Sequence, residues 1–127
     1  MSYDSKKVLV VDDSSVMRQI IKNTLKQIGF GGGNISDADD GDAGLKKAKD
    51  APPDLIVSDW NMPKMTGIDF LKGVRSDGGL KGIPFLMVTS EADKEKIMEA
   101  VQAGVSQYIV KPFNANQLEE KIQAIFK

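Results

Sequence analysis

The sequence predicts one α/β domain built around a parallel β-sheet with helices on both faces. Short apolar runs alternate five times with stretches in which apolar residues recur every three or four positions, as in amphipathic helices. The apolar runs are continuous, which is typical of strands that are buried on both faces. Right-handed crossover helices between parallel strands explain both observations. A length of 127 residues suits a single core.

The expected strands are short, and the second is the weakest of them. They lie at residues 8–11 (VLVV), 34–36 (NIS), 55–57 (LIV), 83–88 (IPFLMV) and 108–110 (YIV).

The expected helices differ in how strongly the sequence indicates them. The clearest lies at residues 14–28 and ends at Gly29. Two others are expected at residues 93–103 and 115–126, and two weaker candidates, which glycines interrupt, lie near residues 42–50 and 66–76. Asn114 followed three residues later by Gln117 resembles a capping box at the start of the last helix along the chain.

Residue types that are missing from the chain exclude whole classes of function. There is no cysteine and no histidine, so disulfides, Ser-His-Asp triads, thiol catalysis and ordinary zinc sites are excluded. Any bound metal should therefore be a hard ion with oxygen ligands, such as Mg²⁺. The formal net charge of -1 gives no basis for predicting nucleic-acid binding. We find neither a signal peptide nor an apolar run of membrane-spanning length, so we expect a cytoplasmic protein without a membrane partner.

Two segments resemble ligand-binding loops but lack the required spacing. GFGGG at residues 29–33 has neither the glycine spacing nor the lysine of a phosphate loop, and we interpret it as a flexible connection. DADDGDAG, counted from Asp37, has Asp42 where a calcium loop needs glycine and Ala48 where it needs glutamate.

Polar residues follow four of the five expected strands. They are Asp12 and Asp13, then Asp59, then Thr89, and finally Lys111. Parallel sheets bind ligands at the carboxyl ends of their strands. If the first strand lies beside the third, three carboxylates converge there with a hydroxyl and an ammonium group. Each residue alone could cap a turn or lie on the surface, but their arrival at one edge favours a functional site.

The residue types at this edge suit phosphoryl transfer. Three close carboxylates repel one another unless a cation intervenes, and Mg²⁺ accepts a few protein oxygens together with water and phosphate. A carboxylate can attack phosphorus to give an aspartyl phosphate. The metal, Lys111 and the Thr89 hydroxyl are suited to neutralise the charge of the transferred group.

Four segments resemble the receiver domain of two-component response regulators. They are VLVVDDSSVMRQII, LIVSDWNMPKMTGIDFLKGVR, VTSEA and YIVKPF. The DWNMP and VKPF runs are similar to those of the stand-alone chemotaxis regulators in that family. The resemblance covers essentially the whole chain. It implies a single receiver domain at residues 1–127 without an output domain, and a flavodoxin-like (βα)5 three-layer sandwich with strand order 2-1-3-4-5.

The resemblance also implies roles for the residues at the strand ends. Asp59 would be the phosphoacceptor. Asp13 and Asp59 would bind Mg²⁺ directly together with the backbone carbonyl of Asn61, and Asp12 would hold a metal-bound water.

Further residues would respond to the phosphoryl group. Thr89 and Lys111 would contact its oxygens, and the Lys111–Pro112 peptide bond would be cis. Tyr108 would be a switch that turns inward when Thr89 is drawn toward the phosphate.

The implied function is that of a signalling protein that assists its own phosphorylation and dephosphorylation. A histidine kinase would supply the phosphoryl group, and the phosphorylated protein, expected to be a monomer, would bind a flagellar motor switch protein to change rotation. A phosphatase is a further candidate partner. The expected docking face consists of Ala92, Lys94, Ile97, Tyr108, Val110 and Lys121.

Two alternatives remain open at this point. A phosphate sink or phosphorelay intermediate would use the same site without contacting the motor, so the site does not separate it from a motor regulator. A metal-dependent phosphatase acting on other molecules is the weaker alternative, because no motif for a substrate pocket is present.

Overall fold

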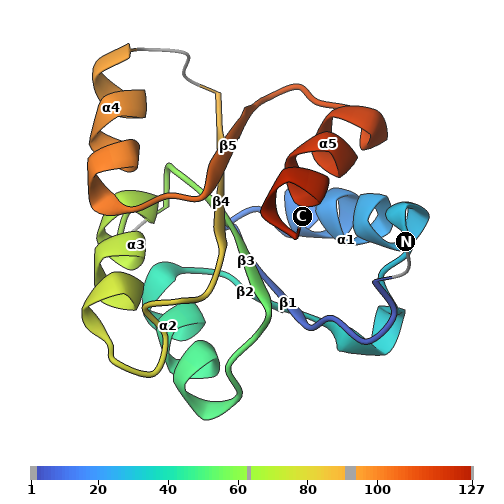
Figure 1. Cartoon of the computed structure of the whole chain (residues 1–127), viewed down its shortest axis with the longest axis horizontal. Coiled ribbons are helices and arrows are strands. Elements are labelled where there is room, and N and C mark those ends of the chain that lie inside the picture. The colour runs from blue at the N-terminus through green and yellow to red at the C-terminus, as the bar shows by residue number, and fades with distance from the viewer. Residues whose placement is uncertain (1–2, 63, 91–93, 127) are drawn as a thin grey trace.

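Five parallel strands form one sheet in the order β2-β1-β3-β4-β5, which confirms the predicted order. The computed structural model describes residues 3–62, 64–90 and 94–126. Strands and helices alternate along the chain (Figure 1). The strands are β1 (Val8–Val11), β2 (Ile35–Ala38), β3 (Leu55–Asp59), β4 (Phe85–Thr89) and β5 (Gln107–Val110).

The helices lie close to their predicted positions. They are α1 (Ser15–Ile28), α2 (Gly41–Asp50), α3 (Gly67–Ser76), α4 (Lys94–Ala103) and α5 (Ala115–Ile125), with a short 3-10 turn η1 (Gly32–Asn34) before β2. Among the described residues, no helix combines the length and the apolar character needed to cross a membrane.

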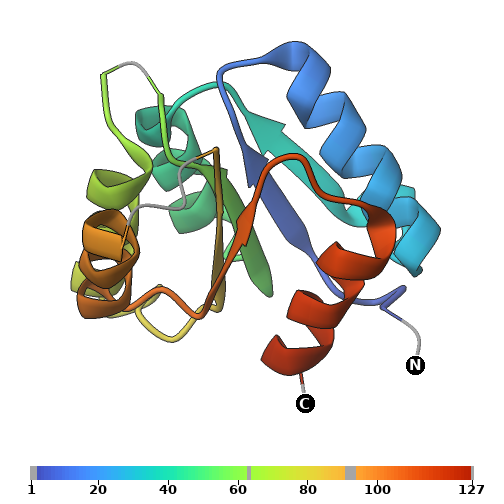
Figure 2. The ribbon, with the colours of Figure 1, turned by 90° about the horizontal axis from the view of Figure 1, so that it is seen from above.

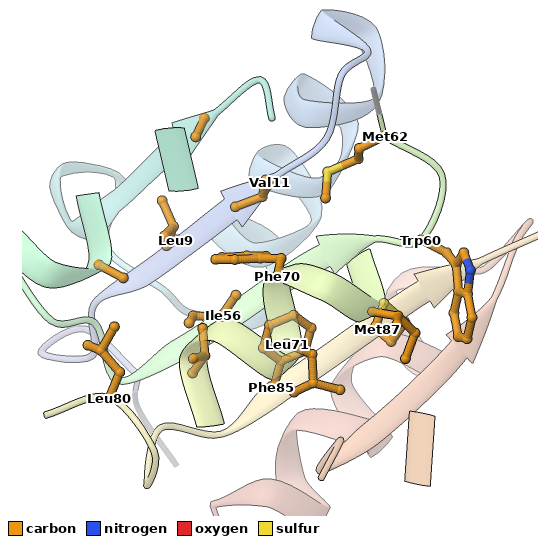
Figure 3. Packing of buried hydrophobic residues seen from close by; sticks show 14 of the residues in the cluster. Leu9, Val11, Ile56, Trp60, Met62, Phe70, Leu71, Leu80, Phe85 and Met87 are labelled. Atoms are coloured by element: carbon orange, nitrogen blue, oxygen red, sulfur yellow. The ribbon is translucent and has the colours of Figure 1, made fainter. Parts of the chain in front are cut away.

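The helices form a layer on each face of the sheet. Helices α1 and α5 cover one face, and α2, α3 and α4 cover the other (Figure 1). On the second face, Phe70 of α3 packs edge to face against Phe85 of β4, with ring centroids 5.4 Å apart (Figure 3). Both rings are fully buried, which stabilises the contact between α3 and the middle of the sheet.

Capping side chains begin four helices, each in the loop that follows a strand. The side chains of Ser14, Asp40, Thr66 and Asn114 each accept a hydrogen bond from the third backbone N–H beyond them. Asn114 and Gln117 form the predicted capping box. Such caps stabilise a helix by about 1 kcal/mol each and fix where the chain turns away from the sheet.

Helices α1 and α4 expose apolar residues that helical spacing alone would place with the buried ones. In α1, Ile21 and Leu25 are buried, whereas Val16 is 67% exposed and Ile20 is 47% exposed. In α4, Ala100 is the buried residue, and Met98 and Val101 are each 60% exposed. The apolar side of each of these helices is thus wider than the part that packs against the sheet.

The glycine-rich segment is folded rather than a simple flexible connection. Gly29, at a φ of 127°, ends α1 by donating its N–H to the carbonyls of Leu25 and Lys26. Phe30 is buried and stacks on Tyr3, with ring centroids 4.8 Å apart and an interplanar angle of 8°. The aromatic contact attaches this segment to the N-terminal part of the described chain.

The same stacked pair holds the two ends of the described chain together. The Tyr3 ring lies 6.1 Å from the Phe126 ring, and Lys6 Nζ lies 5.0 Å from the centroid of Phe126. The N- and C-termini accordingly lie on the same side of the molecule (Figure 2).

Helix α3 begins against the end of β3 at a position where only glycine fits. A Cβ on Gly67 would lie 2.3 Å from the carbonyl oxygen of Asp59 and 2.9 Å from the Cα of Trp60. The Gly67 N–H donates a 2.8 Å hydrogen bond to the Trp60 carbonyl. The missing side chain therefore allows α3 to approach the strand that ends in Asp59.

We predict that Gly67→Ala lowers the free energy of unfolding by about 1–3 kcal/mol, because the added methyl group would collide with backbone atoms that cannot rotate away. Urea denaturation followed by circular dichroism measures this change. Gly78→Ala is the matched control, since a Cβ there meets nothing within 4 Å. Equal stability of the two variants would contradict the close approach.

Candidate functional site

The five predicted strand-end residues come together at the carboxyl edge of the sheet. Asp59 and Thr89 are the last residues of β3 and β4, Asp12 and Asp13 follow β1, and Lys111 follows β5. The loops after β1, β3 and β5 leave the sheet on one side, toward the top of Figure 2. Asp12, Asp59 and Thr89 are buried, whereas Asp13 is exposed.

The Lys111 ammonium lies between two of the carboxylates. Its Nζ is 3.0 Å from Asp59 Oδ1 and 3.8 Å from Asp12 Oδ2. The first distance is that of a charge-assisted hydrogen bond. The ammonium group therefore neutralises part of the negative charge at the strand ends.

The carboxylates form a group that could hold a metal ion. Asp12, Asp13 and Asp59 each offer an oxygen, and these oxygens lie within 4.8 Å of one another. Asp12 Oδ2 is buried and has no hydrogen-bond donor within the described part of the chain. Oxygen ligands of this kind, with a lone pair left for a cation, fit Mg²⁺ better than a softer metal.

Burial raises the pKa of the Asp12 carboxyl group above its usual range. The negative charges of Asp59 and Asp13 add to the rise, and the Ser14 N–H and the Lys111 ammonium oppose it. The charged form of Asp12 is thus disfavoured in the folded protein without metal.

Backbone hydrogen bonds fix the positions of the site residues. The Asp12 N–H donates to the Ala38 carbonyl at 3.2 Å, which continues the β1–β2 ladder. The Lys111 N–H donates to the Thr89 carbonyl at 2.7 Å, so β5 places Lys111 beside the end of β4. In addition, the Ser14 N–H donates to Asp12 Oδ1 at 2.9 Å. The side chains therefore project from the rigid end of the sheet.

Sequence reasoning missed Arg18, which contacts the site from α1. Its Nη1 donates to the Asp12 carbonyl at 2.7 Å, and its Nε donates to Asp37 Oδ2 at 2.9 Å. A signal for it was present, because a cation near the start of a helix opposes the helix dipole and implies an acceptor nearby.

Trp60 directly follows Asp59 and is buried, although its position suggested a partly exposed aromatic at the edge of the site. Trp60 is 7% exposed and belongs to the core cluster (Figure 3). Lys96 Nζ of α4 lies 5.9 Å from its ring centroid. The neighbour of Asp59 is thus packed between the core and α4.

The remaining predicted residues lie in the loop after β3, in or after β5, or outside the described residues. Asn61 is exposed in the loop after β3. The Lys111–Pro112 peptide bond is cis, as predicted. Tyr108 is half-buried, and Lys121 Nζ lies 5.4 Å from its ring centroid. Ala92 lies outside the described residues.

Besides Tyr108, three of the expected face residues come from α4 and β5. Lys94 is exposed, whereas Ile97 and Val110 are half-buried.

The chain is similar to known proteins over nearly its whole length. The family described as response regulator receiver domain matches residues 8–123. The chemotaxis protein CheY of Pseudomonas aeruginosa is 54% identical over 95% of this chain and 96% of its own length. CheY-3 of Vibrio cholerae is 53% identical over 95% and 92%. The structure of the chemotaxis response regulator CheY4 of Vibrio cholerae superposes with a TM-score of 0.86 at 42% identity, covering 94% of this chain and 98% of that one.

We predict that Asp12→Asn raises the melting temperature of the metal-free protein at neutral pH. The raised pKa of Asp12 means that its ionised form costs stability above that pKa, and the cost is relieved as the pH falls through it. The difference between variant and wild type should therefore shrink on acidification. Thermal unfolding in chelator at several pH values measures it, and a variant that is less stable at neutral pH would contradict the prediction.

Proposed function

Because the chain belongs to the response regulator receiver family, we propose that it is a chemotaxis response regulator phosphorylated on Asp59. A histidine kinase supplies the phosphoryl group, and the phosphorylated form binds the flagellar motor switch. The observation that supports this best is the group of three carboxylates around the Lys111 ammonium. The chain contains no histidine of its own, so a phosphohistidine donor must be another protein.

Asp59 is the best-placed nucleophile among the three carboxylates. It ends a central strand, and its Oδ1 is held 3.0 Å from Lys111 Nζ. Asp12 is only 1% exposed, compared with 7% for Asp59, so an incoming donor reaches Asp12 less readily. An Asp59 oxygen attacks the donor phosphorus, the phosphorus–nitrogen bond breaks, and the imidazole leaves with the electron pair.

Positive charge and hydrogen-bond donors must offset the negative charge on the oxygens of the transferred phosphoryl group. Lys111 and the Thr89 hydroxyl serve the phosphoryl oxygens. Asp13, Asp59 and the Asn61 carbonyl would hold Mg²⁺, with Asp12 acting through a water. When bound, the ion would neutralise the charge that the carboxylates and the phosphoryl oxygens share.

The surface beside Lys111 suits the approach of a donor protein. A cavity of about 550 Å³ is lined by Met17 and Ile20 of α1 and by Lys111, Pro112 and Phe113. The exposed side chain of Ile20 adds apolar area next to the charged site. We therefore expect the kinase domain to dock across α1 and the β5–α5 loop.

The output face lies on α4, β5 and α5. When Thr89 moves toward the phosphoryl group, Tyr108 rotates inward and changes the face that includes Ile97 and Val110. Lys94 and Lys121 flank these apolar side chains, and Ala92 completes the face. An apolar strip with lysines at its margins suits an amphipathic, acidic helix of the motor switch.

We predict that Asp59→Asn abolishes phosphorylation by acetyl phosphate, whereas wild type incorporates one phosphoryl group when Mg²⁺ is present. The loss follows because an amide oxygen is too weak a nucleophile to form the acyl phosphate. Intact-mass spectrometry at low pH measures the modification, which should be lost in base.

Asp42→Asn is the control for that experiment, because Asp42 is exposed at the start of α2 and lies outside the carboxylate group. It should be phosphorylated like wild type. Full modification of Asp59→Asn would refute the assignment of the phosphoacceptor.

We predict that activation with beryllofluoride increases affinity for an acidic amphipathic peptide of a flagellar switch protein by about 5–150-fold, as expected for an allosteric coupling of about 1–3 kcal/mol. Fluorescence anisotropy of a labelled peptide measures the binding. Lys94→Ala should weaken it, and Lys72→Ala on the exposed side of α3 should not. If activation leaves the affinity unchanged, or if no binding is seen, the phosphate-sink alternative describes the protein better.

A further inference from the structure

We propose that Arg18 is a positioning residue for the metal site, and that it holds the Asp12–Asp13 peptide in the orientation that brings Asp13 to the other carboxylates. This inference rests on the proposed function, since it assigns a residue to the same Mg²⁺ site. Arg18 would not bind the metal itself; the carboxylates that would do so are Asp12, Asp13 and Asp59.

The first observation is the hydrogen bond at the end of β1. The Asp12 N–H completes the ladder to β2 by donating to the Ala38 carbonyl. Strand β2 ends at Ala38, so it offers no next N–H to the Asp12 carbonyl. Arg18 Nη1 takes that place with a 2.7 Å hydrogen bond. The arginine thus supplies the donor that the neighbouring strand no longer provides.

The second observation is what this bond fixes. The Asp12 carbonyl and the Asp13 nitrogen belong to one planar peptide unit. A donor that holds the carbonyl therefore also sets the direction in which the Asp13 Cα leaves the strand. Asp13 is exposed, yet its carboxylate lies within 4.8 Å of those of Asp12 and Asp59. Because the Asp13 side chain is exposed, its backbone must set where the carboxylate lies relative to the other two.

The third observation is the anchor on the far side of the guanidinium group. Arg18 Nε donates to Asp37 Oδ2 at 2.9 Å, and Lys22 Nζ lies 3.5 Å from the same oxygen. Lys47 Nζ in turn donates to the Asp37 carbonyl. Although burial alone would raise the pKa of Asp37, the Arg18 hydrogen bond and the Lys22 and Arg18 charges lower it. The guanidinium group is therefore held at two of its corners.

Charge and position predict opposite effects when Arg18 is removed. Loss of a nearby positive charge would by itself strengthen the binding of a divalent cation to the carboxylates. Loss of the backbone clamp would weaken it, because Asp13 would have to be ordered by the metal. The sign of the change in Mg²⁺ affinity therefore separates a positioning role from a purely electrostatic one.

The test is a Mg²⁺ titration of the purified protein. Binding is measured by calorimetry and by the fluorescence emission of Trp60, the single tryptophan of the chain. The variants are Arg18→Ala, Arg18→Lys and the control Lys22→Ala. Lysine keeps the charge of Arg18 but cannot bridge the Asp12 carbonyl and Asp37 as a planar fork does. Lys22 shares the Asp37 partner, so Lys22→Ala removes a cation while leaving the clamp in place.

We expect Arg18→Ala to raise the Mg²⁺ dissociation constant on the order of tenfold, the lower end of the cost of losing an outer-shell partner of a metal ligand. Arg18→Lys should change it in the same direction, and Lys22→Ala should leave it unchanged or lower it. Urea unfolding without metal shows whether each variant is folded. If Arg18→Ala is unfolded, the Mg²⁺ affinity of Arg18→Lys tests the positioning role instead.

Two other results would overturn the inference in distinguishable ways. Unchanged or tighter Mg²⁺ binding in both Arg18 variants would show that Arg18 has no positioning role, while the metal site itself would stand. Wild-type protein that binds no Mg²⁺ would refute the metal site on which the inference rests.

Discussion

The Lys111 ammonium lies 3.0 Å from Asp59 Oδ1 and offsets part of the repulsion between the carboxylates at the carboxyl edge of the sheet. Among the described residues, three carboxylates face one ammonium group at this edge, so acidic groups remain in excess there. A divalent cation would balance them, and an incoming phosphoryl group would restore the excess. On the proposed function, metal binding and phosphoryl transfer would each change the net charge of the site. The raised pKa of Asp12, caused first by burial and then by the neighbouring carboxylates, agrees with this excess of acidic groups.

Rigid backbone around Asp59 keeps this charged group in place. Behind the carboxylate, the Asp59 carbonyl lies so near Gly67 that no side chain fits between β3 and α3. Beside it, Trp60 is buried and its N–H donates to the Val88 carbonyl of β4 at 3.0 Å. Asp59 is therefore joined directly to backbone that also forms part of the core.

The sequence predicts most of this arrangement because its signals are local. Continuous apolar runs locate the strands, and each site residue directly follows one of them, so parallel pairing brings Asp12 and Asp59 together. Strand order does not follow from such signals and came from the family resemblance. The exposed sides of α1 and α4 could not be predicted, because spacing shows that Ile20 and Met98 lie on apolar arcs but not how wide the sheet contact is. Arg18 has a local signal as a cation near the start of a helix, but that signal does not identify its partner Asp37, which lies 19 residues away along the chain.

The aromatic contacts of Tyr3 with Phe30 and Phe126 have a consequence for how the domain can be combined with others. They gather both ends of the described chain at the amino edge of the sheet, since β1 starts there and α5 returns there from the carboxyl edge (Figure 2). A fluorescent protein or a second domain fused through either end would therefore be tethered on the side away from Asp59. Docking of a donor at the strand ends would remain sterically free, which makes the fold suitable as a module in larger assemblies.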